Sequence, residues 1–193
     1  MAELAFDEPT HEYRLDGEVI PSVSQIVQKA GLWGPGPGFM KMDPAIKGTR
    51  IHLATEYLDK GILDWASVEG TGYVPFLSAW QDLLSDLGAK PVEIETRHWM
   101  TVEGLTFAGT VDRVLEFPDG SLQVCDIKTG RHYPKPYGVQ INAYRLLVED
   151  LLGREMAGCF CAHINDKGKY QIRAHDEPDW VERWRSICAE QAQ

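Results

Sequence analysis

Two short apolar segments carry acids that an ordinary buried strand would exclude. The predicted strand 105–117 contains Asp112, and the predicted strand 121–128 contains Asp126 and, two residues later, Lys128. Side chains alternate along a strand, so Asp126 and Lys128 share a face and lie roughly 6.5–7 Å apart along it. Carboxylates beside an ammonium can hold a hard divalent cation and a phosphate oxygen, which is the chemistry of metal-assisted phosphodiester hydrolysis.

The turn between these segments decides whether the two acids meet. A two-residue loop would put Asp112 and Asp126 on opposite faces, since a one-residue slip turns every side chain over. A three-residue loop at 118–120 would place them directly across, with Cβ atoms about 4.5–5.5 Å apart. The Pro-Asp-Gly sequence there favours the three-residue loop, a type I turn followed by a left-handed glycine. The alternative is a surface hairpin whose acids face water and whose Lys128 pairs with one of them.

Four motifs in order resemble the PD-(D/E)xK nuclease superfamily, and its RecB-like branch of phage-type exonucleases most. They are GTRIH at 48–52, GTVD at 109–112, DIKTG at 126–130 and QINAY at 140–144. Each motif alone is weak, but the four together have the order and spacing of the family. PSVSQIV near the N-terminus is also similar to phage and mitochondrial members, so the resemblance covers about residues 13–150.

The resemblance implies a set of metal ligands and an accessory acid. Asp112 and Asp126 would bind Mg²⁺ or Mn²⁺, helped by the Ile127 backbone carbonyl and by His52. On the preceding strand the expected acid is Glu95, with Glu93 as the alternative because both would share a face. His52 also has a simpler interpretation, a helix-surface histidine bonded to the residue four positions later.

The resemblance also implies roles for groups around the metal. Lys128 would position and activate water, or stabilise charge on the phosphorane. Gln140 and Tyr144, one helical turn apart, would contact DNA and support the site, although Tyr144 also fits an apolar core stripe. The residues Arg131 and Lys135 lie in a basic and aromatic stretch that suits single-strand binding or, equally, a solvated loop. Arg50 would lie at the mouth of the same groove.

The expected function is a metal-dependent deoxyribonuclease that hydrolyses phosphodiesters with metal-activated water. An exonuclease of phage or prophage recombination, repair or DNA processing fits best, with DNA ends as substrate and a homo-oligomer or an annealing protein as candidate partner. The rival interpretation is a non-catalytic DNA-binding or recombination-partner module that keeps the nuclease fold. An enzyme acting on another phosphate ester is a third. No iron–sulfur cluster is expected, because no cysteine precedes Cys125 and Cys188 stands alone.

Composition is ordinary for a folded globular protein. The 193 residues are 44% hydrophobic and 25% charged, with a formal net charge of −10 that argues against a general nucleic-acid coating protein. A localised basic groove stays compatible with that charge. No apolar run reaches the ~20 residues of a membrane span, and the N-terminus lacks a secretory signal. We therefore expect a cytoplasmic protein, in a bacterial or phage-infected host cell, with no membrane partner.

The order of elements predicts one mixed α/β domain. The resemblance makes it a restriction-endonuclease-like domain, with a central mixed β-sheet flanked by helices. Residues 11–90 should form an N-terminal hairpin and helices, 91–153 the catalytic core, and 156–190 a C-terminal hairpin and helix. In this arrangement a helix near 43–61 would carry His52, and a helix at 138–153 would carry Gln140.

Overall fold

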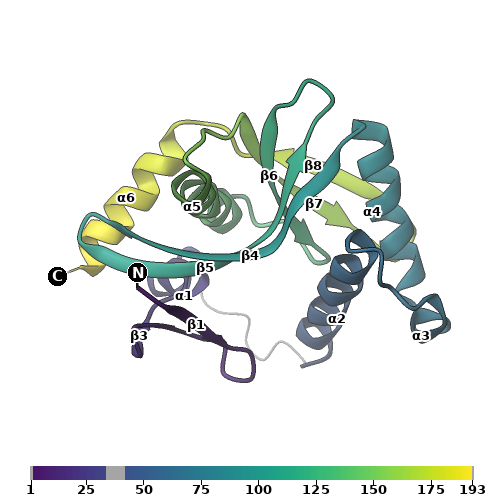
Figure 1. The fold of residues 1–193 in the computed structure, drawn as a ribbon, viewed down its shortest axis with the longest axis horizontal. Coiled ribbons are helices and arrows are strands. Elements are labelled where there is room, and N and C mark those ends of the chain that lie inside the picture. The colour runs from purple at the N-terminus through teal and green to yellow at the C-terminus, as the bar shows by residue number, and fades with distance from the viewer. Residues whose placement is uncertain (1, 34–41, 193) are drawn as a thin grey trace.

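The computed structural model describes residues 2–33 and 42–192, with side chains from residue 47 onward in the second range. A small antiparallel sheet comes first and a group of helices follows it (Figure 1). The strands of the small sheet are β1 (Leu4–Asp7), β2 (Glu12–Leu15) and β3 (Glu18–Ile20). The helices are α1 (Val23–Lys29), α2 (Met42–Asp59), α3 (Trp65–Val68) and α4 (Val74–Leu87).

Local sequence signals explain where several of these elements begin and end. Asp16 and Gly17, between β2 and β3, have φ of 51° and 86°, as a tight hairpin turn requires. Ser22 accepts the Gln25 N–H at 3.1 Å, and the Gln25 side chain accepts the Ser22 N–H at 2.8 Å. This reciprocal capping box begins α1, as its sequence predicts. Strand β1 and helix α3 have four residues each and were not predicted, because such short segments carry little periodicity.

A second, five-stranded sheet positions the chemistry. Its strands in spatial order are β4 (Lys90–Val102), β5 (Leu105–Glu116), β6 (Leu122–Lys128), β7 (Gly158–Ile164) and β8 (Tyr170–Ala174). Strands β6 and β7 are parallel and the other neighbours are antiparallel. A parallel pair needs a crossover, which α5 (Pro134–Leu152) supplies, and α6 (Asp179–Gln191) ends the chain. The predicted mixed sheet flanked by helices is confirmed.

Helices cover both faces of this sheet (Figure 1). One apolar layer joins the sheet to α1, α5 and α6, and the other joins it to α2 and α4. On β6, Val124 packs in the α5 layer and Ile127 in the α4 layer. Strand alternation therefore puts Asp126 and Lys128 on the α5 side. Among the residues that the structure describes, no helix has both the length and the apolarity needed to cross a bilayer.

The β5–β6 turn has the three-residue form that the sequence predicts. The Phe117 N–H donates to the Ser121 carbonyl at 2.9 Å, and Gly120 has a φ of 80°. The pairing then runs in the same register to Arg113 opposite Cys125. The turn thus brings the two acid-bearing stretches of β5 and β6 into alignment.

Gly109 allows α5 to lie close to β5. A Cβ atom at Gly109 would lie 2.9 Å from Cδ1 of Leu147 and 3.0 Å from Cε1 of Tyr144, both on α5. Only a residue without a side chain permits this approach. The glycine of the GTVD motif therefore has a packing reason, since it sets α5 against the strand that carries Asp112.

Candidate active site

A histidine and two carboxylates from three elements meet beside the sheet. His52 from α2, Glu95 from β4 and Asp112 from β5 each place a ligand atom within 4.8 Å of the other two. His52 Nδ1 lies 3.4 Å from Asp112 Oδ2. The alternative partner of His52, Glu56, instead pairs with Lys60 at 2.6 Å. Three segments far apart in sequence therefore converge on one group of possible metal ligands.

The backbone of β4 selects Glu95 over Glu93 for this group. Glu95 has a φ of 51°, and it is the only non-glycine residue inside a strand with positive φ in the described ranges. Such a conformation is uncommon and is found at functional sites more often than elsewhere. Glu93 instead accepts a hydrogen bond from Thr96 Oγ1 at 2.8 Å. The structure thus places Glu95, the acid that the resemblance favours, beside His52 and Asp112. The catalytic role of Glu95 stays a prediction.

Asp112 ends the backbone ladder between β5 and β6. The pairing stops at Arg113 opposite Cys125, and one further step would set Asp112 opposite Asp126. At that step Asp112 Oδ2 accepts the Ile127 N–H at 2.8 Å, so a side chain replaces a ladder carbonyl. The acids therefore lie on neighbouring strands as the turn predicts. Metal ligation by the Ile127 carbonyl stays a prediction.

Asp126 lies outside the three-residue cluster and pairs with Lys128. Asp126 Oδ2 is 2.5 Å from Lys128 Nζ, and Lys128 Nζ also donates to Gln140 Oε1 at 3.0 Å. Gln140 Nε2 donates to Ser24 Oγ at 2.9 Å and to the Tyr144 hydroxyl oxygen at 3.3 Å. Gln140 and Tyr144 are both buried, so they support Lys128 from behind. Direct DNA contact by these two residues stays a prediction.

Burial and charge shift the pKa values of the central groups. Burial, followed by the nearby Asp112 carboxylate, raises the pKa of Glu95 to about 8. Burial acts to lower the pKa of Lys128, but the Asp126 and Asp112 carboxylates outweigh it and raise that pKa. The Lys128 ammonium therefore keeps its proton at neutral pH. Burial raises the pKa of Asp126, and Lys128 opposes this rise.

Arg113 is a residue of the candidate site that sequence reasoning missed. Its side chain is fully buried, with Nε 2.5 Å from Asp59 Oδ2 and Nη1 2.9 Å from Glu95 Oε1. Nη1 also donates to the Asp112 carbonyl at 2.6 Å, and Nη2 donates to Thr55 Oγ1 at 3.3 Å. Arg113 thus connects α2 to two residues of the acid cluster. The available signal was strand alternation, which puts an arginine on the core side of an apolar segment.

The predicted DNA-contacting cations are exposed side chains on the segments next to His52 and Lys128. Arg50 is exposed on α2, two residues before His52. Arg131 and Lys135 are exposed in the stretch that follows Lys128. DNA binding by each of them stays a prediction.

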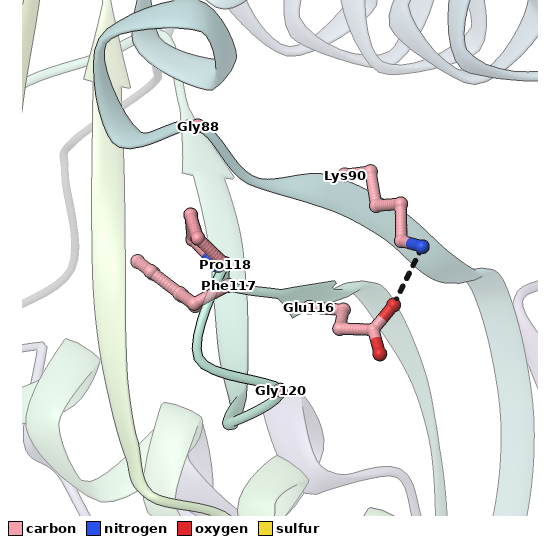
Figure 2. Close-up of a pocket in the computed structure, with 6 residues that line it drawn as sticks. All are labelled: Gly88, Lys90, Glu116, Phe117, Pro118 and Gly120. Carbon is pink, nitrogen blue, oxygen red and sulfur yellow. Dashed lines mark ion pairs between the residues drawn. The ribbon is translucent and has the colours of Figure 1, made fainter.

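A surface hollow at the β5–β6 turn is separate from the acid cluster. Figure 2 shows the residues that line it: Gly88, Lys90, Glu116, Phe117, Pro118 and Gly120. Its charged groups are an exposed ion pair, Lys90 to Glu116 at 2.8 Å. Asp112 lies about four residues further along β5, so the hollow is no part of the candidate active site.

The family model of the PD-(D/E)XK nuclease superfamily matches residues 41–193, which include the acid cluster and the lysine. The chain belongs to this superfamily. The fold described above, a mixed sheet flanked by helices, is the restriction-endonuclease-like architecture expected of a PD-(D/E)XK protein. The comparison with curated proteins found no match.

Two solved structures are similar to this PD-(D/E)XK chain. One is SSO0001, with 20% identity and a TM-score of 0.40 over 75% of this chain and 69% of that one. The other is an exonuclease candidate from Eubacterium rectale, with 10% identity and a TM-score of 0.46 over 86% of this chain and 69% of that one. At these scores neither similarity bears on function.

The donor set fits the divalent metal that PD-(D/E)XK nucleases use. Glu95 and Asp112 supply oxygen ligands, and His52 supplies a nitrogen within the same 4.8 Å group. Burial and the Asp112 charge raise the pKa of Glu95 although the Arg113 guanidinium lies 2.9 Å away, so a divalent cation at this position would favour the ionised carboxylate. Asp126, on the adjacent strand, is a further carboxylate, and the charges of Asp112 and His52 act on it.

Proposed function

We propose that this PD-(D/E)XK protein is a Mg²⁺- or Mn²⁺-dependent DNA nuclease, acting as an exonuclease in phage or prophage recombination and repair. The observation that carries the proposal is the position of the His52, Glu95 and Asp112 cluster beside the Lys128–Asp126 pair. Oxygen-rich donors next to a buried ammonium suit hydrolysis of a phosphodiester. The exonuclease and phage parts rest on the RecB-like motifs.

The residues of the chain divide the work of hydrolysis. A divalent cation bound at the cluster would lower the pKa of a water molecule and neutralise charge on the phosphate. Lys128 is held between Asp126 and Gln140, at 2.5 Å and 3.0 Å, so its ammonium has a defined position. In the metal-free protein the Asp126 and Asp112 carboxylates raise the pKa of Lys128, so its ammonium carries a positive charge that can stabilise negative charge on the phosphate.

DNA as the substrate is supported by the distribution of charge. The chain has a formal net charge of −10, so a polyanion needs a local cationic surface. Arg50, Arg131 and Lys135 are exposed on the segments that carry His52 and Lys128, and we propose that they provide cations for such a surface. A small phosphate ester would not need cations at several separate positions.

The test uses end-labelled linear and circular DNA, each single- and double-stranded, with Mg²⁺, with Mn²⁺ or with EDTA. We expect metal-dependent degradation of linear DNA and no cutting of circles. Asp126→Asn and Lys128→Met should abolish degradation, and circular dichroism should show that both variants are still folded. Lys128→Met should also lower the melting temperature, because it leaves the buried Asp126 carboxylate without its cation.

Matched control variants are Asp166→Asn and Lys167→Met, both exposed in the turn between β7 and β8. Both should digest DNA as the unmodified protein does. Full activity of the purified Lys128→Met variant would refute the assigned site. DNA binding without cleavage in any divalent metal would instead support a non-catalytic DNA-binding module.

A further inference from the structure

Three aromatic rings form a cluster next to the catalytic lysine. Trp33, which follows α1, packs edge-to-face on Tyr133 and Tyr137, with ring centroids 5.8 Å and 5.5 Å apart. Tyr133 and Tyr137 meet at 5.9 Å with an interplanar angle of 83°. Edge-to-face packing fixes each ring by its neighbours. The cluster is therefore a rigid aromatic surface built from two distant parts of the chain.

The outer rings of this cluster are accessible, and the inner ring is not. Tyr133 is 38% exposed and Trp33 is partly exposed, whereas Tyr137 is 7% exposed and belongs to the core. Tyr137 also donates from its hydroxyl to the Arg131 carbonyl at 3.0 Å, which holds the loop that carries Tyr133. Core packing alone accounts for Tyr137 but leaves the exposure of Tyr133 unexplained.

The stretch that carries Tyr133 and Tyr137 is basic in an acidic protein. Residues 127–148 contain no Asp or Glu, although the chain has 29 acidic residues. The same stretch contains Lys128, Arg131 and Lys135, and the Arg131 guanidinium lies 6.0 Å from the Tyr133 ring centroid. Aromatic rings interleaved with cations bind the bases and the phosphates of a nucleic-acid strand together.

The aromatic surface begins within contact distance of the catalytic groups. Lys128 Nζ lies 4.7 Å from the Tyr137 ring centroid, and the Tyr133 and Trp33 centroids lie 5.9 Å and 5.5 Å from that ring. Stacked nucleotides rise about 3.4 Å each along a strand. A base on Tyr133 or Trp33 would therefore lie within about three nucleotides of the phosphate that Lys128 contacts.

We infer that Tyr133 and Trp33 stack with unpaired bases beside the scissile phosphate, so that the substrate is a single-stranded end. This inference rests on the proposed function and specifies its substrate class. Inside a duplex both faces of each base are covered by neighbouring pairs. A base inside the strand must therefore be unpaired to stack on Tyr133, whereas a blunt duplex exposes only the outer face of its terminal pair.

The inference is tested by combining a protein variant with substrate variants, as in a double-mutant cycle. Single-stranded oligonucleotides carry one abasic residue at successive positions from either end, and kcat/KM is measured for the unmodified protein and for Tyr133→Ala. We expect one or two abasic positions to reduce kcat/KM of the unmodified protein by roughly 5- to 150-fold, the range of base–aromatic stacking. At those positions Tyr133→Ala should lose less than about 2-fold further, because the stacking partner is already absent.

Control variants separate stacking from general damage. Tyr133→Phe keeps the ring and should behave as the unmodified protein does. Tyr57→Ala and Trp65→Ala remove rings of similar exposure, 39% and 46%, on α2 and α3 away from the cluster. Neither should change the response to abasic residues, whereas Trp33→Ala should weaken it.

Two outcomes would overturn the inference. One is an equal effect of Tyr133→Ala on intact and abasic strands, and the other is cleavage of a blunt duplex as fast as of a single strand. The same cycle measured by equilibrium binding in EDTA keeps the two proposals distinguishable. If the protein cleaves no DNA but abasic residues and Tyr133→Ala still weaken binding non-additively, the nuclease proposal is refuted and the stacking proposal stands. If the protein cleaves DNA but abasic residues and Tyr133→Ala act independently, the stacking proposal is refuted and the nuclease proposal stands.

Discussion

Replacing Arg113 with methionine should be among the most damaging single changes in this protein. The guanidinium is fully buried and pairs with Asp59 at 2.5 Å and with Glu95 at 2.9 Å. Methionine fills part of the volume but leaves both carboxylates without their cation. The Asp59 side chain is only 3% exposed, so it would keep just the hydrogen bond from Trp80 Nε1 at 2.8 Å.

The cost follows mainly from Asp59. Removing one partner of a buried ion pair costs roughly 3–5 kcal/mol, because the other charge stays buried and uncompensated. Glu95 adds little at neutral pH, because its pKa of about 8 already keeps most of it protonated. We therefore expect Arg113→Met to lower the free energy of unfolding by about 3–5 kcal/mol, a large part of the ~5–15 kcal/mol typical of a folded domain.

Urea denaturation of the metal-free protein measures this change. The matched control is Arg97→Met, whose partner Glu8 is exposed at 3.3 Å, so that its loss should cost no more than about 1 kcal/mol. Asp59→Asn removes the stranded charge, and the double variant with Arg113→Met should be less destabilised than the sum of the single variants. Strict additivity, or a loss below about 1 kcal/mol for Arg113→Met, would show that the pair does not hold α2 to the sheet.

Two further predictions follow from the pKa of Glu95 and from a close backbone contact. Glu95 has a pKa raised from 4.5 to about 8, so the folded metal-free protein binds more protons than the unfolded chain between these values, and its stability should fall as pH rises through that range. Addition of Mg²⁺ or Mn²⁺ should therefore raise the melting temperature more at pH 8.5 than at pH 6. Glu95→Gln should remove most of this difference. If the difference is unchanged in Glu95→Gln, Glu95 is not a metal ligand. A Cβ atom at Gly138 would lie 2.7–2.9 Å from ring atoms of Trp180, so Gly138→Ala should lower the free energy of unfolding by about 1–3 kcal/mol. Gly130→Ala, with nothing within 4 Å, should change it by less than about 0.5 kcal/mol, and equal effects of the two variants would be evidence against tight α5–α6 packing.

Several parts of the fold were predictable because they depend on neighbouring residues. The Pro-Asp-Gly turn at 118–120 and the Ser22–Gln25 capping box are chosen by local chemistry, and both have the predicted geometry. The helix that carries His52 was expected over 43–61 and spans Met42–Asp59. The helix that carries Gln140 begins four residues before the expected start, at Pro134, because prolines are tolerated in a first helical turn.

The sequence by itself determined the family, the order of elements and the register that aligns Asp112 with Asp126. These depend on side-chain alternation and on a short turn, which act over a few residues. Only the tertiary structure placed Glu95, and not Glu93, beside His52 and Asp112, because that group joins three elements that lie far apart in the chain. The pairing of Arg113 with Asp59 and the meeting of Trp33 with Tyr133 were decided there too, since each joins segments more than fifty residues apart. Such contacts form only when packing of the two helix layers against the sheet brings their elements together, so no local sequence pattern predicts them.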